Sequence, residues 1–282
     1  MFTKLKQIIQ TKTYEDLVSV GMMFICFIIN AILIMIEWGT ILLQFNLEKI
    51  MFIYWIFWFL ALYCLYKCFV TDVSVPHVAK IDTTTYPPCT HCGYGKPERT
   101  HHCSQCKKCV YGMDHHCTFI GNCIGHANKK YFVLLMLYIT LMMLFVCCII
   151  FPLAIYATIF PKRGPFYHWI FRLFDIIQLF LGVYVIIIIS FAYTKLLSGI
   201  MCNRTTIESV GMKQLNLWST HETRRLNKYD LGTLKNLQQI FGTSLWKALL
   251  PIDTYNPYQY LHYEYNNECI EQNHFEIDDY EF

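Results

Sequence analysis

The sequence predicts an all-α polytopic membrane protein with four transmembrane helices and one small domain between the second and third. Two observations lead to this fold class. Of the 282 residues, 55% are hydrophobic and only 15% are charged, whereas an ordinary soluble domain has about 25% charged residues. Four stretches are also long and apolar enough to cross a bilayer, which takes about 20 residues as a helix. A single run of this kind could be a buried core helix, but four of them favour a membrane protein.

The expected elements follow in chain order. An N-terminal segment, 1–16, leads to the first helix, 17–45, and a short loop then leads to the second helix, 50–70, so these two should form a tight hairpin. The third and fourth helices are expected at 131–160 and 174–198. The remaining segments are a Cys/His-rich domain, a C-terminal region and an acidic, disordered tail, expected at 71–130, 199–263 and 264–282.

The distribution of positive charge predicts the orientation. The N-terminal segment, the Cys/His-rich loop and the C-terminal region hold 17 Lys and Arg residues, whereas the two short loops hold four. Because cytosolic segments carry an excess of Lys and Arg, we expect both termini and the Cys/His-rich domain in the cytosol. The first helix is too long for a cleaved signal peptide, so we interpret it as a retained anchor.

The Cys/His-rich domain has the spacing of metal ligands. Between Cys89 and Cys123 lie seven of the 14 cysteines and five of the 11 histidines. The cytosol is reducing, so cysteines there favour metal binding or catalysis over disulfides, and Cys-x-x-Cys pairs suit zinc. Two closed sites need eight ligands, which six cysteines and two histidines would supply, leaving one thiol over. Spacing alone does not decide which half-sites share an ion or which histidines bind. The alternative is a binding finger in which all seven cysteines are ligands.

The odd thiol is expected to be a nucleophile. Asp114-His115-His116-Cys117 stands at the centre of the run. A cysteine reacts as its thiolate and therefore needs a base or a cationic neighbour. His115 could take the proton of Cys117, and Asp114 could hold the ring of His115, as in Cys-His-acid triads. The alternative for Asp114 is an ordinary turn residue.

The run resembles the cysteine-rich domain of the DHHC protein S-acyltransferases, or protein palmitoyltransferases. It reads Cys89-x2-Cys92-x9-His102-Cys103-x2-Cys106-x2-Cys109-x4-Asp114-His115-His116-Cys117-x5-Cys123, and similar flanking motifs are Lys96-Pro97-x-Arg99 and Asn122-Cys123-Ile124-Gly125-x2-Asn128-x3-Phe132.

The resemblance implies two structural zinc ions and a catalytic set. One ion would take Cys89, Cys92, His102 and Cys109, and the other would take Cys103, Cys106, His116 and Cys123. The catalytic residues would be Asp114, His115 and Cys117. After this tetrad the family usually has Pro-Trp, and this chain has Thr118-Phe119 instead, which affects the expected shape of the pocket but not the reaction class.

The function that follows is protein S-acylation. The enzyme would move a long-chain acyl group, typically palmitoyl, from the co-substrate acyl-CoA to cysteine thiols of client proteins through a thioester on Cys117. A pocket among the helices would shelter the chain, since burial of each methylene is worth about 0.8 kcal/mol. The expected partners are client proteins with membrane-proximal cysteines, acyl-CoA and the bilayer, with no nucleic acid. The membrane would be that of the Golgi, the ER or the cell surface.

Two other classes of function remain as alternatives. One is a membrane-anchored zinc-finger adaptor or a protein resembling a ubiquitin ligase, although the run does not end in the Cys-x-x-Cys of a RING domain. The other is a transporter or channel, which would need polar or charged residues inside its helices, and the predicted helices have almost none at mid-depth.

The C-terminal region carries two weaker motifs. Thr205-Thr206-Ile207-Glu208 resembles the TTxE motif of the family and is also a suitable helix start. Residues 231–242 place Leu234, Leu237, Ile240 and Phe241 on one helical face, which should pack on the transmembrane helices or lie on the membrane. Asn236 either braces the catalytic domain, as the resemblance implies, or lies on a solvated face. Cys64, Cys68 and Cys202 are either acylation sites or small apolar fillers.

Overall fold

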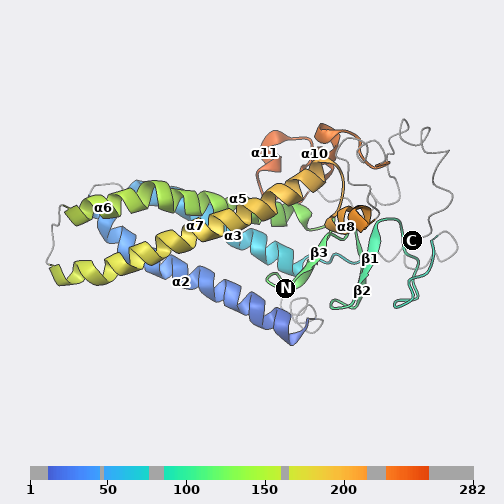
Figure 1. Cartoon of the computed structure of the whole chain (residues 1–282), viewed down its shortest axis with the longest axis horizontal. Helices are drawn as coiled ribbons and strands as arrows, with labels where there is room; N and C mark the ends of the chain where they lie inside the picture. Colours follow the sequence, from blue (N-terminus) through green and yellow to red (C-terminus); the bar gives the residue numbers. More distant parts are fainter. Residues whose placement is uncertain (1–11, 45–47, 76–85, 160–164, 215–226, 254–282) are drawn as a thin grey trace.

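The computed structural model describes residues 12–44, 48–75, 86–159, 165–214 and 227–253. Within these residues, four helices are long and apolar enough to cross a membrane, as the sequence predicts. Figure 1 shows the long helices running alongside one another, with the strands and the C-terminal helices gathered at one end. The predicted acidic tail, 264–282, lies outside the described residues.

The first two spans are single helices, and the third is composite. The first two correspond to α2 (Tyr14–Gln44) and α3 (Met51–Val70), with the short 3-10 helix η1 (Glu48–Ile50) immediately before α3. The third consists of α5 (Lys129–Phe145), the π-helical turn η2 (Val146–Ile150) and α6 (Phe151–Ile159). The fourth is α7 (Pro165–Met201). Among the described residues after it lie three shorter helices, α8 (Thr206–Gln214), α10 (Thr233–Phe241) and α11 (Leu245–Ala248).

The π-helical turn in the third span has a local cause. Pro152 lies two residues after it, and a proline has no backbone N–H to donate to the carbonyl four residues earlier, that of Cys148. The proline ring also crowds that carbonyl. A widened turn accommodates the disruption without ending the helix.

The expectation of an all-α protein is partly wrong, because the Cys/His-rich domain contains two small antiparallel sheets. The first pairs β1 (Thr100–Cys103) with β2 (Lys108–Tyr111), and the second pairs β3 (His115–Cys117) with β4 (Asn122–Ile124). Strands of three or four residues made of histidine and cysteine are too short for an apolar alternation to show in the sequence. Most of the described fold is nevertheless helical.

Two asparagines join the second sheet to the end of α3. Asn122 donates from Nδ2 to the carbonyls of Cys68 (3.0 Å) and Thr71 (2.9 Å), and Asn128 donates to the carbonyl of Cys68 at 3.3 Å. The last carbonyls of a helix have no partner within the helix, so these amides cap α3. Cys68 and Cys64 are themselves fully buried in the hydrophobic core between α3 and α5. They are apolar fillers rather than accessible acylation sites.

The C-terminal helices dock on α5 and α7. On α10, Leu237, Ile240 and Phe241 pack against a buried cluster from α5 and α7, whereas Leu234 points outward and is exposed. Lys130, at the start of α5, donates from Nζ to the carbonyls of Lys247 and Ile252, both at 2.9 Å.

Asn236 does not lie on a solvated face. It is only 1% exposed. Its amide donates to the carbonyl of Met201 at 2.9 Å and to Asp230 Oδ1 at 2.6 Å, and its Oδ1 accepts from the backbone N–H of Leu231 at 3.0 Å. Met201 is the last residue of α7, so Asn236 holds the end of the fourth span against α10.

Candidate active site and metal centres

Two clusters of cysteine and histidine side chains could hold metal ions, and within each the ligand atoms lie within 4.8 Å of one another. They are the two sets of four that the resemblance implies. The first consists of Cys89, Cys92, His102 and Cys109, and the second of Cys103, Cys106, His116 and Cys123.

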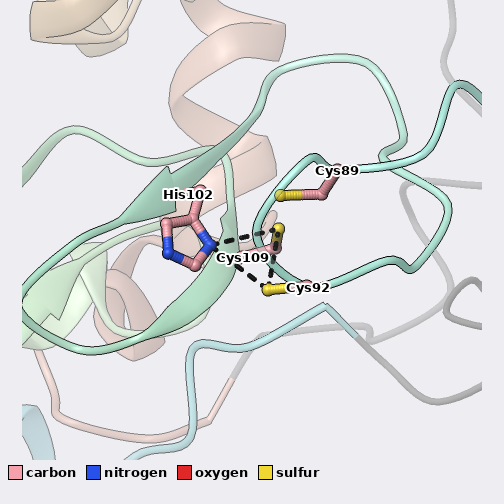
Figure 2. Close-up of side chains that lie close together, drawn as sticks. All are labelled: Cys89, Cys92, His102 and Cys109. Carbon is pink, nitrogen blue, oxygen red and sulfur yellow. Dashed lines mark hydrogen bonds between the residues drawn. The ribbon is translucent and has the colours of Figure 1, made fainter.

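The first cluster has the dimensions of a zinc site. Figure 2 shows its four side chains converging, with Cys92 Sγ 3.2 Å from His102 Nδ1 and 3.7 Å from Cys109 Sγ. With Zn–S bonds of about 2.3 Å and a Zn–N bond of about 2.0 Å, tetrahedral ligands lie about 3.5–3.8 Å apart. The observed separations agree with that geometry.

The second cluster is equally close. His116 Nδ1 lies 3.6 Å from Cys103 Sγ, 3.3 Å from Cys106 Sγ and 3.6 Å from Cys123 Sγ. Each cluster therefore offers three sulfurs and one imidazole nitrogen. Four protein ligands close the shell of a zinc ion, so ions here would support the fold and offer no open position for catalysis.

The two hairpins explain how neighbouring residues reach different clusters. In the first sheet His102 pairs directly with Cys109, and in the second sheet His116 pairs directly with Cys123. Directly opposed residues of an antiparallel pair share a face, so each pair supplies two ligands to one cluster. Successive residues of a strand point to opposite faces, so Cys103, the residue after His102, is directed to the second cluster. The interleaving of the two clusters is a consequence of strand geometry.

The same alternation separates Cys117 from the metal. His116 is the middle residue of β3, and it points to the second cluster. His115 and Cys117 lie on the other face of β3. On that face the opposing residues Asn122 and Ile124 of β4 are buried. The thiol that the ligand count leaves over is thus held beside a histidine and on the face opposite to the second cluster.

The side chains of the tetrad form a chain of contacts. Asp114 Oδ2 lies 2.9 Å from Nδ1 of His115. Cys117 lies on the same face of β3 as His115, near enough to contribute to the raised pKa of its imidazole. The structure therefore brings together the three residues that the sequence predicts to be catalytic, in the order acid, histidine and thiol. Asp114 is buried and bonded to His115, which a turn residue on the surface would not be.

Residues from two other elements hold Asp114. Thr206, at the start of α8, donates from Oγ1 to Asp114 Oδ2 at 2.7 Å and from its backbone N–H to Oδ1 at 3.1 Å. The ammonium of Lys129 lies 3.5 Å from Oδ1. These contacts fix the carboxylate and, through it, the imidazole of His115.

The TTxE segment is itself anchored by an ion pair. Glu208 and Thr205 form a capping box, with the N–H of Thr205 2.8 Å from Glu208 Oε2 and the N–H of Glu208 3.2 Å from Thr205 Oγ1. Arg99 binds both oxygens of Glu208, at 2.7 and 2.9 Å, and also contacts Asn203. The Lys96-Pro97-x-Arg99 motif and the TTxE segment are thereby joined in one network.

Comparison with known proteins decides the family. A family model described as "DHHC palmitoyltransferase" matches residues 82–213. "Probable protein S-acyltransferase 15" of Arabidopsis thaliana is 32% identical over 201 residues, which is 66% of this chain and 72% of that protein. This chain belongs to the DHHC palmitoyltransferase family. "Palmitoyltransferase ZDHHC15" of Xenopus laevis is 34% identical over 169 residues, 59% of this chain and 46% of that one.

A yeast relative matches this chain with the same identity and a similar coverage as the frog protein. "Palmitoyltransferase PFA3" of Saccharomyces cerevisiae is 34% identical over 179 residues, which is 59% of this chain and 51% of that protein. The chain spans about half the length of most of these curated relatives. The resemblance to the DHHC family that the sequence motifs indicated is therefore confirmed.

The electrostatics of the DHHC tetrad favour a charged pair. Burial opposes ionisation of Asp114, but its hydrogen bond to His115 and the nearby Lys129 hold the pKa of the carboxyl well below its usual range. Burial likewise disfavours a charged His115, but hydrogen bonds to Asp114 and Cys117 outweigh it and raise the pKa of the imidazole to about 9. An imidazolium at neutral pH stabilises a neighbouring thiolate.

The surroundings of Cys117 differ on its two sides. Its side chain packs against the hydrophobic core that α3 and α5 share. The next residues, Thr118 and Phe119, are exposed, and Phe119 is 67% exposed. The aromatic ring that contacts the tetrad is instead that of Phe132, edge-on to His115 with centroids 5.5 Å apart. In this DHHC chain the residues that replace Pro-Trp point away from the buried side of the thiol.

Lys129 and Thr206 are functional candidates that sequence reasoning did not connect to the tetrad. Thr206 lies in a motif that the sequence singled out, but nothing in the spacing shows that it contacts Asp114, 92 residues earlier. Lys129 counted only as one of many positive charges. The ammonium of Lys129 is buried beside the carboxylate of Asp114, and composition does not reveal such a contact.

Proposed function

We propose that this chain is a protein S-acyltransferase that transfers a long-chain acyl group, typically palmitoyl, from acyl-CoA to cysteine thiols of client proteins. One observation carries the proposal. Strand alternation in β3 holds Cys117 beside His115 and Asp114, on the face opposite to His116, which points to the second cysteine cluster. The names of the relatives support the same reaction class.

The proposed reaction has two thioester exchanges. In the first, the Cys117 thiolate attacks the thioester carbonyl of acyl-CoA, the bond from carbonyl carbon to CoA sulfur breaks, and the CoA thiolate leaves with the proton held by His115. In the second, His115 takes the proton of a client thiol, the client thiolate attacks the acyl-Cys117 carbonyl, the bond from that carbon to the Cys117 sulfur breaks, and the Cys117 thiolate is released beside the charged imidazole. Each step exchanges one thioester for another, so no external energy source is needed. His115 holds the proton, and Asp114 orients and stabilises the charged imidazole.

The packing of Cys117 supports the membrane location of this chemistry. The thiol lies where the Cys/His-rich domain meets the hydrophobic core of α3 and α5. An acyl chain on Cys117 would therefore extend toward the helices rather than into water, and a client cysteine would have to approach close to the membrane surface. We propose zinc as the metal of both clusters, with a structural role. Its chemistry when bound is to fix the two hairpins, and no step of the transfer passes through it.

We further propose that the Cys/His-rich domain and both termini face the cytosol, on the membranes of the Golgi, the ER or the cell surface. The excess of Lys and Arg in those segments supports this orientation. Clients would then be proteins that carry cysteines near the cytosolic leaflet.

The proposal is tested by following the acyl-enzyme directly. Purified protein in detergent is incubated with a clickable palmitoyl-CoA analogue, and the label is read before and after hydroxylamine, which cleaves thioesters. We expect a hydroxylamine-sensitive label on Cys117 by mass spectrometry. Cys117→Ser should lose the label and keep both zinc ions, because the serine lies off the metal-binding face.

Cys202→Ser is the matched control, since Cys202 is also partly exposed and lies at the end of α7. This variant should be labelled normally. A Cys117→Ser protein that still acquires the hydroxylamine-sensitive label at the normal rate would refute the assignment of the nucleophile.

A further inference from the structure

The first turn of α2 reaches into the second metal centre. Asp16 Oδ1 lies 3.1 Å from Nε2 of His116, although the two residues are 100 positions apart in the chain. Asp16 is only 3% exposed, and the side chain of His116 is nearly buried as well. Burying a carboxylate costs free energy unless it is hydrogen-bonded or paired with a charge. The contact with His116 offsets that cost for Asp16.

The two ring nitrogens of His116 face different partners. Nδ1 points at the three sulfurs of its cluster, at 3.3–3.6 Å. A nitrogen that binds a metal must carry no proton, so with metal bound the proton of the neutral ring is on Nε2. Nε2 then donates its hydrogen to Asp16. Carboxylates in this position fix the tautomer and orientation of a metal-binding histidine.

We propose that Asp16 is the outer carboxylate of the second metal site, and that it positions His116 and so ties the first transmembrane helix to β3, the strand that carries Cys117. Asp16 acts through His116 and touches no reacting atom, so it is a positioning residue. This inference concerns metal retention and goes beyond the acyltransferase function proposed above.

Asp16 also forms a reciprocal pair with Thr13 at the start of α2. Its second oxygen, Oδ2, accepts a hydrogen bond from Thr13 Oγ1 at 2.8 Å, and its own N–H donates to the same hydroxyl at 3.1 Å. The carboxylate therefore divides its two oxygens between the start of α2 and the imidazole. One rotamer serves both contacts.

The turn between β3 and β4 packs closely on the first turns of α2, which carry Asp16. Gly121 there has φ +61°, and a Cβ added to it would lie 2.7 Å from Cγ2 of Val20 and 3.3 Å from the carbonyl oxygen of Asp16. Only glycine fits that approach. The contact between α2 and the second hairpin thus rests on the backbone as well as on the Asp16–His116 pair.

Helix capping is the competing explanation for a buried Asp16. Thr13 and Asp16 form a reciprocal pair at the start of α2, and loss of such a cap alone costs about 1 kcal/mol of stability. A pure capping role predicts that variants of Thr13 and Asp16 behave alike. A role at the metal predicts that only Asp16 variants change metal retention.

The test measures zinc release from the full-length protein in detergent, with a chromogenic chelator and no acyl substrate. In Asp16→Ala we expect one of the two zinc ions to leave about 10–100-fold faster, the usual effect of removing such a partner, and the other to leave at the wild-type rate. Asp16→Asn keeps a hydrogen-bond acceptor but no charge, so it should lie between Asp16→Ala and the wild type. With 113Cd in place of zinc, one of the two NMR signals should shift.

Two controls separate the explanations. Thr13→Ala removes the cap and leaves the contact with His116, and Glu15→Gln removes the adjacent exposed charge. Both should release zinc at the wild-type rate. The inference is overturned if Asp16→Ala and Asp16→Asn retain both ions normally, or if Thr13→Ala releases zinc as fast as Asp16→Ala. Should Asp16→Ala fail to fold, the isosteric Asp16→Asn and its 113Cd spectrum decide the question.

Discussion

At the scale of single residues, the side chains of two adjacent histidines have different contacts. His115 contacts Asp114 and belongs to the face of β3 that carries the thiol, whereas His116 contacts three sulfurs of the second metal cluster. The two rings are next to each other in sequence and have chemically different surroundings. Their removal should therefore cause different kinds of failure.

We expect His116→Ala to lose about one zinc ion and to melt at a lower temperature, because metal binding is coupled to folding. His115→Ala should keep both ions and near-normal stability, yet form the acyl-enzyme about 10²–10⁴-fold more slowly. Higher pH should partly restore His115→Ala, since it supplies thiolate without the imidazole, and should not restore His116→Ala. Zinc content, melting temperature and the pH dependence of self-acylation measure these outcomes.

Loss of zinc from His115→Ala, with an unaffected His116→Ala, would show that the two assignments are reversed. Equal rates of acylation in His115→Ala and the wild type across the pH range would remove His115 from the mechanism.

The sequence predicted the members of this site better than their supports. The eight cysteines and histidines of the clusters and the Asp-His-His-Cys tetrad lie within 35 consecutive residues, so short spacings and a family resemblance identify them. Asp16, Lys129 and Thr206 contact that segment from other elements. Each is a common polar residue whose role arises only when the helices bring it to the tetrad or to the metal.

At the scale of elements, the first hairpin serves both metal clusters. His102 and Cys109 of β1 and β2 belong to one cluster, and Cys103 at the end of β1 belongs to the other. The first hairpin therefore contributes residues to both clusters.

We expect Cys103→Ala to bind about one zinc ion per chain instead of two and to destabilise the Cys/His-rich domain, because the site that loses a ligand also holds β3. Elemental analysis and thermal melting test this. Retention of two zinc ions in Cys103→Ala would contradict the proposed ligand set.

The helix α8 contacts Asp114 through the hydroxyl and the backbone N–H of Thr206. Thr206→Val removes the hydroxyl that donates to Asp114 Oδ2 and keeps the shape of the side chain. A hydrogen bond to a charged group is worth about 1.5–3 kcal/mol, which corresponds to a rate about 10–100-fold lower if the whole loss falls on the acylation step. We expect that slowing with normal zinc content.

Ser209→Ala is the control for α8, because its hydroxyl bonds only to the local carbonyl of Thr205 among the contacts described. It should acylate at the normal rate. If both variants slow acylation equally, the effect comes from the helix and not from the contact with Asp114.

At the scale of the whole molecule, the long helices could be predicted and their assembly could not. Composition and run length are enough to identify four spans. The docking of the C-terminal helices depends on a few contacts between distant segments, such as Lys130 with the carbonyls of Lys247 and Ile252. The small sheets were missed because their strands of three or four residues are too short to show an apolar alternation.

Orientation is the prediction that belongs to this scale. We expect epitope tags at either terminus to bind antibody in cells whose surface membrane alone is permeabilised, because both termini should face the cytosol. A tag inserted after Arg163, between the third and fourth spans, should bind only after the internal membranes are also permeabilised if the protein is in the ER or the Golgi, and in intact cells if it is at the cell surface. The opposite pattern would place the Cys/His-rich domain away from the reducing compartment and would contradict the proposed orientation.

The alternation of side chains in β3 also limits how this segment can vary among relatives. Substitution of one residue removes one role and leaves the others in place. Inserting or deleting a single residue between Asp114 and Cys117 would exchange the two faces, so that the thiol would point at the metal and a ligand would point at the acyl chain. Both roles would fail together. The length of this stretch is therefore constrained more tightly than the identity of any one of its side chains, and functional variants should differ here by substitution and not by a change in length.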